Sequence, residues 1–152
     1  TDSNIEKILD LGHVGEAQKI NADLFIALED TEIMPVIEPI GTDSNGQTFN
    51  INADNVAGKL ASSLNACKLI MLTDVDGIYN QDKELISEIS ISQINSLIKK
   101  SIINKGMIPK ANTCVNAIDN GVISAHILNG TIPHILLVEV FTEKGSGTMI
   151  ID

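Results

Sequence analysis

Lys110 lies at an unusual place, in the first turn of a helix expected over residues 108–119. A lysine there is at the positive end of the helix dipole, which disfavours positive charge, so its position needs a reason. An anion such as a phosphate, held by free backbone N–H groups and by the Lys110 ammonium, would supply one. The alternative is a solvated surface lysine. The segment Gly106-Met107-Ile108-Pro109-Lys110 is therefore a candidate anion site.

A second candidate is the turn that follows the apolar run of residues 69–72. Such a run is typical of a strand buried on both faces of a parallel sheet, and ligands bind outside the carboxyl ends of such strands. Its carboxylates predict either a magnesium ion or hydrogen bonds from a ribose, and the alternative is a solvated turn. The turn consists of Thr73, Asp74, Val75, Asp76, Gly77, Ile78 and Tyr79.

The third candidate is the run Asn50-Ile51-Asn52-Ala53-Asp54, where an expected strand passes directly into a helix. Asn50 and Asn52 would point to one side of the strand, and Asp54 would open the helix. Helix capping by Asn52 or Asp54 is the alternative interpretation, although it does not account for Asn50.

The elements that must position these residues alternate between strands and helices. Residues 1–20 suggest a strand pair turning through glycines, and Asn21 is expected to cap a short helix. Asn45-Gly46 predicts a hairpin, and Ser90 or Ser92 a helix start. Further strands are expected over residues 48–52, 69–72, 122–128 and 148–151, and helices over 53–65 and 108–119. The fold class is therefore α/β, a three-layer sandwich with a mostly parallel central sheet, in a single domain of residues 1–152.

Composition and charge exclude several classes of function. The formal net charge is −10, and all ten basic residues are lysines, so nucleic acid is not an expected partner. No run approaches the ~20 apolar residues of a membrane span, and no GxxxxGK[ST] or GxGxxG motif is present.

Cys67 and Cys114 lack CxxC spacing and are interpreted as reduced structural thiols. His13, His126 and His134 lack metal-ligand spacing and are interpreted as structural histidines, so no metal site built on them is expected.

Three long runs resemble the amino acid kinase family, and within it the N-acetylglutamate kinases. They are GTDSNGQTFNINADNVAGKLA, KLIMLTDVDGIYN, and KGMIPKANTCVNAIDNGVISAHILNGTIPHILLVEVFTEKGSGTMI. The resemblance covers almost the whole chain and implies the carbamate kinase-like fold. It also implies ATP-dependent phosphorylation, with Mg²⁺, of the side-chain carboxylate of N-acetyl-L-glutamate, the second step of arginine biosynthesis.

The resemblance also implies roles for particular residues. Lys110 would stabilise the phosphoryl group in transfer, and Asp54 would orient catalytic lysines. Asn50 and Asn52 would bind the acetylglutamate, while the turn of residues 73–79, Gly106 and Met107 would border the nucleotide. His126, Glu139 and Gly145 match positions that bind inhibitory arginine in some members.

The family's amino-terminal half, with its glycine-rich phosphate loops, a second lysine and the substrate-binding arginine, has no counterpart in these residues. The chain is therefore expected to correspond to the carboxyl-terminal, nucleotide-binding part and to be inactive alone. Two alternatives are a kinase of another amino acid or of carbamate, and a non-catalytic module that binds arginine or a partner protein.

Location and assembly are further expectations. The chain has ten lysines and no arginine, with 25 Ile and 14 Asn. This composition is typical of genes whose codons are rich in A and T, as in plastid genomes or some bacteria. The expected location is therefore the plastid stroma or the bacterial cytoplasm. The resemblance implies a homo-oligomer at full length, with a PII-type signalling protein as a partner.

Overall fold

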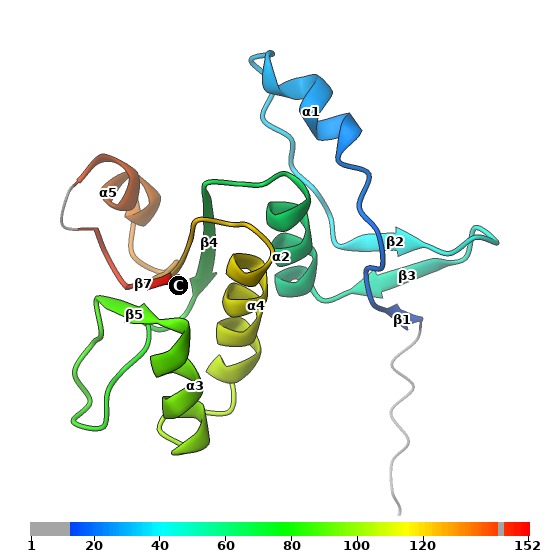
Figure 1. Cartoon of the computed structure of the whole chain (residues 1–152). Coiled ribbons are helices and arrows are strands. Elements are labelled where there is room, and N and C mark those ends of the chain that lie inside the picture. Colours follow the sequence, from blue (N-terminus) through cyan, green and yellow to red (C-terminus); the bar gives the residue numbers. More distant parts are fainter. Residues whose placement is uncertain (1–12, 143–144) are drawn as a thin grey trace, which may run out of the picture.

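The computed structural model describes residues 13–142 and 145–152. The expected strand pair of residues 1–20 falls largely outside these described residues. The elements are β1 (Val14–Gly15), α1 (Asp23–Glu29), β2 (Ile40–Thr42), β3 (Thr48–Ile51), α2 (Ala53–Ser63), β4 (Lys68–Thr73), β5 (Glu88–Ser90), α3 (Ile91–Lys99), α4 (Met107–Asp119), β6 (Ser124–Asn129), α5 (Ile135–Phe141) and β7 (Thr148–Ile151) (Figure 1).

The described strands form two sheets. One has the order β1-β3-β2, with a parallel β1–β3 pair and an antiparallel β2–β3 hairpin that turns through Asn45-Gly46, where Gly46 has a φ of 82°. The other has the order β4-β6-β7-β5, in which β6 and β7 are antiparallel and the other two pairs are parallel. The α/β class is confirmed, but the expected central sheet is divided between these two groups.

Strand β4 pairs in parallel with β6, and Thr73 stands opposite Asn129 at the ends of the two strands. The carboxyl ends of both strands therefore meet at one edge. The expectation that β4 is buried on both faces is only half right: Leu69 and Met71 are buried, whereas Leu72 is 46% exposed. Strand β4 is one of the two edge strands of its sheet, and its burial follows the two-residue period of the pleat.

Helices α2 and α3 begin at the expected residues because side-chain caps fix them. Ser90 caps α3 in a reciprocal capping box with Gln93, and the Asn52 side chain accepts hydrogen bonds at the start of α2. Helix α1 starts one residue later than expected, with Ala22 at its N-cap, although Asn21 Oδ1 still accepts from the Asp23 N–H. Helices α2 and α4 pack against each other, and both contact β4 (Figure 1).

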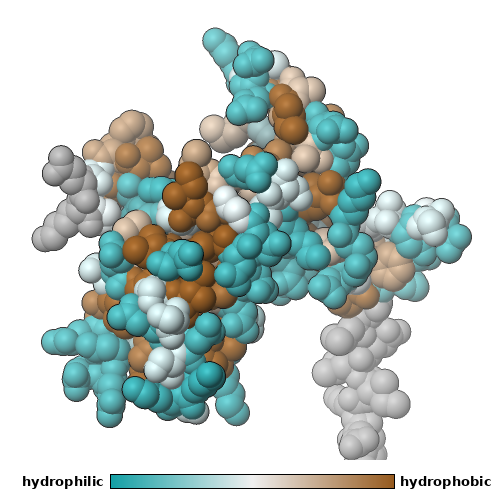
Figure 2. Space-filling view, in the orientation of Figure 1, coloured by the Kyte–Doolittle hydropathy of each residue, from teal (hydrophilic) through white to brown (hydrophobic). Residues whose placement is uncertain are grey.

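Apolar side chains remain exposed on two helices. On α1, Leu24 is 62% and Ile26 55% exposed; on α5, Leu137 is 55% and Phe141 79% exposed. These faces appear at the top and left of Figure 2, and the described residues do not cover them. None of the described helices combines the length and apolarity needed to cross a membrane.

Candidate functional site

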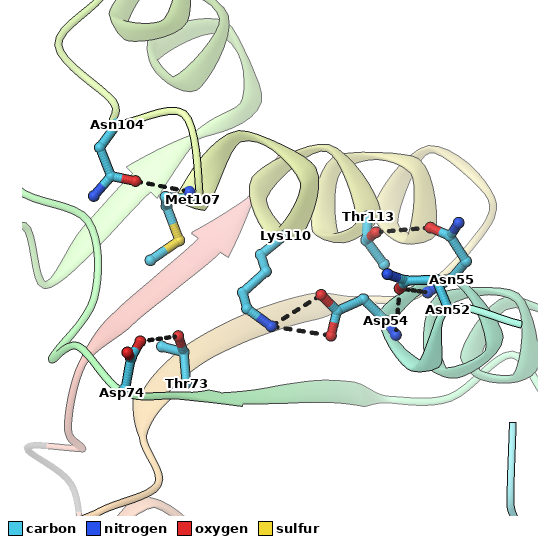
Figure 3. Close-up of polar contacts among 9 residues, drawn as sticks. All are labelled: Asn52, Asp54, Asn55, Thr73, Asp74, Asn104, Met107, Lys110 and Thr113. Atoms are coloured by element: carbon cyan, nitrogen blue, oxygen red, sulfur yellow. Dashed lines mark hydrogen bonds and ion pairs between the residues drawn. The ribbon is translucent and has the colours of Figure 1, made fainter. Parts of the chain in front are cut away.

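Lys110 and Asp54 form an ion pair between the first turns of α4 and α2. The Lys110 Nζ atom lies 3.1 Å from Asp54 Oδ1 and 2.9 Å from Oδ2, and both side chains are about three-quarters buried, at 23% and 25% exposed. Figure 3 shows the lysine extending from α4 toward the carboxylate, with Thr73 and Asp74 at the end of β4, against which α4 packs. The structure thus brings together two residues that lie 56 positions apart in the sequence.

The pair explains why a lysine is tolerated at the start of α4. The expected reason was an anion bound by free N–H groups, but the N–H groups of Met107 and Ile108 donate to Asn104 and Pro109 has none. Those two N–H groups are therefore not available to an anion, and an anion site at this helix start stays a prediction that would depend on Gly106 and the Lys110 ammonium. In the structure, the Asp54 carboxylate provides the nearby negative charge.

Gly106 and Met107, both expected to border the nucleotide, differ in their exposure. Gly106 is exposed at the N-cap of α4. The Met107 side chain is only 5% exposed and packs in the apolar core, and its N–H is taken by Asn104. Met107 is thus a core residue whose side chain is not presented to a ligand.

The two asparagines before α2 also differ. Asn52 Oδ1 accepts from the N–H groups of Asp54 and Asn55, at 2.9 and 3.3 Å, so the capping alternative is confirmed for this residue. Asn50 lies exposed on β3, with its backbone paired to β1 and β2. Asn50 therefore keeps its whole side-chain amide for a ligand, whereas Asn52 keeps only its Nδ2 group.

The turn after β4 divides into buried and exposed positions. Gly77 and Ile78 are buried, and the Ile78 N–H donates to Thr148 Oγ1 at 2.8 Å. A Cβ on Gly77 would lie 2.5 Å from the same oxygen, so only glycine fits there. Val75 packs partly against the core. Gly77, Ile78 and Val75 therefore anchor the turn: glycine has no side chain, and the side chains of Ile78 and Val75 pack toward the core.

The exposed positions of the turn carry its polar groups. Asp76 accepts from Asn129 Nδ2 at 2.7 Å and from the Tyr79 hydroxyl at 3.1 Å, which ties the turn to the end of β6. Among the described residues, Asp74 accepts only from the neighbouring Thr73 hydroxyl, at 3.2 Å. The Asp76 carboxylate raises the pKa of Tyr79 by hydrogen bonding to its hydroxyl. Asp74 thus keeps most of its acceptor capacity for an incoming ligand.

The described part of the chain holds no group of three or more His, Cys, Asp or Glu placed to bind a metal ion. Mg²⁺ commonly needs only one or two carboxylates when it arrives with nucleotide phosphates. The exposed Asp74 carboxylate is compatible with that mode of binding.

A second cluster surrounds Glu139 on α5. Its Oε1 lies 2.7 Å from His126 Nδ1 and 3.4 Å from Lys68 Nζ, and its Oε2 accepts from the Ser146 N–H at 2.9 Å. Gly145 is so close that an added Cβ would lie 3.1 Å from the carboxylate. The structure therefore gathers His126, Glu139 and Gly145, the three residues expected at an arginine site, but the carboxylate already has several partners.

Neutral His126 satisfies this cluster. Its Nδ1–H can donate to Glu139 while Nε2, 3.1 Å from Ser124 Oγ, accepts from the hydroxyl. Burial lowers the pKa of His126, and the Lys68 ammonium adds to this effect, outweighing the opposite influence of Glu139. The residue is therefore expected to stay neutral in the folded chain.

Protein stability is accordingly expected to fall on acidification. Because the folded-state pKa of His126 lies below its unfolded value of ~6.5, the unfolded chain takes up this proton first as the pH drops. Urea denaturation between about pH 7.5 and 5.5 should show a falling free energy of unfolding, and His126→Gln should flatten that slope. His13→Gln, at an exposed histidine, is the matched control. An unchanged slope in His126→Gln would contradict the assignment.

Cys114 lies on α4, with its side chain buried in the hydrophobic core. Burial, with a smaller contribution from Asp54, raises the pKa of its thiol to about 12. The thiol therefore stays protonated, as expected of a structural cysteine. Cys67 is free and exposed.

The larger cavities lie away from these residues. One of about 690 Å³ is bordered by residues 15–20, the β2–β3 hairpin and α2, and one of about 500 Å³ lies beside α2 and α4. None of the residues expected at the site lines either cavity. The candidate site is therefore identified by the charged residues at the ends of the strands and not by the size of a cavity.

Sequence reasoning did not assign three of the residues that organise these clusters. Asn104 has the signature of a cap three residues before Met107, and Asn129 ends the strand beside β4, so both were recognisable in principle. Lys68 meets Glu139 across 71 positions, and no local pattern predicts that contact.

Comparison with known proteins places these features in context. The model of the family described as amino acid kinase matches residues 1–129. Among curated proteins, the acetylglutamate kinase of Ehrlichia chaffeensis is 49% identical over 150 residues, which is 99% of this chain and 47% of that protein. The chain spans about half the length of the curated relatives it matches.

Solved structures agree in fold. N-acetylglutamate synthase from Neisseria gonorrhoeae, complexed with coenzyme A and L-arginine, has a TM-score of 0.86 at 31% identity over 92% of this chain and 32% of that one. Carbamate kinase from Giardia lamblia, bound to AMP-PNP, has a TM-score of 0.55 at 26% identity over 74% of this chain and 36% of that one.

Proposed function

This chain belongs to the amino acid kinase family, and we propose that it provides the catalytic lysine and part of the nucleotide site of an acetylglutamate kinase. The reaction is ATP-dependent phosphorylation of the side-chain carboxylate of N-acetyl-L-glutamate. The observation that carries the proposal is the Lys110–Asp54 pair, which joins the starts of two helices packed on β4. The 49% identity to an acetylglutamate kinase favours this substrate over glutamate, aspartate or carbamate.

In the transfer step, a carboxylate oxygen of acetylglutamate forms a bond to the γ-phosphorus of ATP, and the bond from phosphorus to the β–γ bridging oxygen breaks to release ADP. Negative charge spreads over the phosphoryl oxygens as this happens. The Lys110 ammonium has three N–H donors, and its two contacts with Asp54 leave at least one for that charge. Asp54 holds the ammonium in place and so lowers the cost of orienting it.

The nucleotide and substrate would lie on either side of this lysine. The exposed Asp74 and the ordered Asp76 at the end of β4 would border the nucleotide, and the free amide of Asn50 would contact the acetylglutamate. Mg²⁺ would arrive with the ATP phosphates and offset their charge, a need made greater by the formal net charge of −10.

Nucleotide binding tests this proposal directly. The protein encoded by the reading frame that contains this chain is expected to bind a non-hydrolysable ATP analogue with Mg²⁺ in isothermal titration. Asp74→Asn should weaken that binding by about 3- to 10-fold, because it reduces the charge offered to Mg²⁺. Asp82→Asn, an aspartate in the loop that follows the turn, is the matched control. Absence of heat at millimolar nucleotide would count against the proposal.

A second candidate function is an arginine-binding regulatory module. The observation behind it is the gathering of His126, Glu139 and Gly145 around one buried carboxylate, and a synthase solved with L-arginine is 31% identical. It ranks second, because that carboxylate is already paired with His126 and Lys68 and the curated relatives are acetylglutamate kinases. In the same titration, heat with L-arginine but none with the ATP analogue would favour this function over the kinase.

The remaining expectations stay predictions. Plastid or bacterial origin, homo-oligomer formation and a PII-type partner rest on composition and resemblance. A substrate screen with acetylglutamate, glutamate, aspartate and carbamate would identify the acceptor.

A further inference from the structure

Helices α2 and α4 approach unusually closely at Gly58 and Thr113. Gly58 is buried, and a Cβ built on it would lie 2.6 Å from the Thr113 methyl and 3.6 Å from its carbonyl oxygen. Carbon atoms without a bond between them do not approach this closely, because optimal contact lies at about 3.5–4.0 Å. The spacing of the two helices at this point therefore requires a glycine.

Thr113 cannot easily move its methyl group away. Its side chain branches at Cβ, which restricts its rotation within a helix, and the residue is only 8% exposed. Its hydroxyl donates to Asn55 Oδ1 at 3.5 Å, from α4 to α2 (Figure 3). Rotating the side chain would give up this contact as well as the packing.

The close contact lies one turn from the ion pair on both helices. Gly58 is four residues after Asp54, and Thr113 is three residues after Lys110, so each pair shares one helix face. The distance between the helices at Gly58 is therefore coupled to the reach of Lys110 toward Asp54. A displacement of one helix would lengthen the 2.9 and 3.1 Å contacts of that pair.

We propose that Gly58 and Thr113 are positioning residues for the Lys110–Asp54 pair: their contact sets the α2–α4 spacing at which the ammonium is oriented for phosphoryl transfer. The structural part of this inference stands without any activity, and only its effect on rate rests on the proposed function. Neither residue touches the substrate in this mechanism. They act through the lysine and the aspartate.

The test introduces a steric clash between residues 58 and 113 and then removes it with a second substitution. It uses the protein encoded by the reading frame that contains this chain. Gly58→Ala is expected to lower kcat by about 30- to 100-fold while KM for ATP changes less than about 3-fold, because a misplacement of about 1 Å costs a rate factor of this size. Thr113→Ser removes the opposing methyl but keeps the hydroxyl. The double variant Gly58→Ala with Thr113→Ser should therefore recover kcat to within about 3-fold of the original.

Two further measurements separate the possible outcomes. A crystal structure of Gly58→Ala should show Lys110 Nζ moved out of hydrogen-bond distance of Asp54, and the double variant should restore it. Lys59→Ala, which truncates an exposed side chain at the neighbouring position of the same helix, should leave both the pair and kcat unchanged.

Each result has one meaning. An intact pair in Gly58→Ala, or no recovery in the double variant, would overturn the positioning role. A separated pair with unchanged kcat would confirm the positioning role and instead contradict the proposed function of the pair.

Discussion

Replacing Lys110 with alanine is expected to lower kcat by at least ~100-fold, the loss typical of one electrostatic stabiliser of a transition state. The side chain provides a positive charge at the carboxyl edge of β4, in a chain whose formal net charge is −10. That charge matters most when negative charge spreads over the phosphoryl oxygens, so kcat should fall much more than ATP affinity. The measurement is steady-state ADP formation with acetylglutamate, for the protein encoded by the reading frame that contains this chain.

The controls separate charge from structure. Lys110→Ala leaves Asp54 without its partner, but the carboxylate is 25% exposed and stays partly hydrated, so the fold should persist. Circular dichroism and the ATP-analogue titration check that point. Lys59→Ala, at an exposed lysine of α2, removes the same charge away from the site and should leave kcat unchanged. If kcat survives in Lys110→Ala, the lysine does not act on the phosphoryl group.

Local chemistry explains why the elements could be predicted. Asn52 and Ser90 cap α2 and α3, and Asn45-Gly46 turns the β2–β3 hairpin, each within a few residues of its effect. The division into two sheets and the antiparallel β6–β7 pair could not be predicted in the same way. They depend on pairing between strands that are far apart in the sequence, and local propensity and periodicity do not determine which strands pair.

The candidate site shows the same limit. Residue type identified Lys110 and Asp54 as chemically interesting, but the reason offered for the lysine was an anion held by the backbone. The structure instead pairs the lysine with Asp54, and Asn104 takes two of the N–H groups on which that reason relied. Their pairing spans 56 positions and followed only from the resemblance. In the turn after β4, the sequence alone did not show which residues are buried and which are exposed. Ile78 is buried and anchors the turn, whereas Asp74 is exposed.

The 152 residues by themselves are expected to show no measurable phosphorylation of N-acetylglutamate. Phosphoryl transfer relies on several positioned cations, because both the acceptor carboxylate and the phosphoryl oxygens are negative. Among the described residues, Lys110 is the lysine placed at the candidate site, and Asp54 already offsets much of its charge. Each missing stabiliser is worth about 3 kcal/mol, so the absence of several together would remove most of the rate enhancement.

Asn50 does not compensate for those groups. Its exposed amide could contact acetylglutamate, but one neutral amide holds a dianion far more weakly than a charged, bidentate partner does. The assay is hydroxamate or ADP formation by the purified 152-residue chain with ATP, Mg²⁺ and acetylglutamate, beside a relative of full length such as the enzyme of Ehrlichia chaffeensis, of which this chain covers 47%. Turnover near the enzyme median of ~10 per second would contradict the prediction, because residues within this chain would then carry the whole of catalysis.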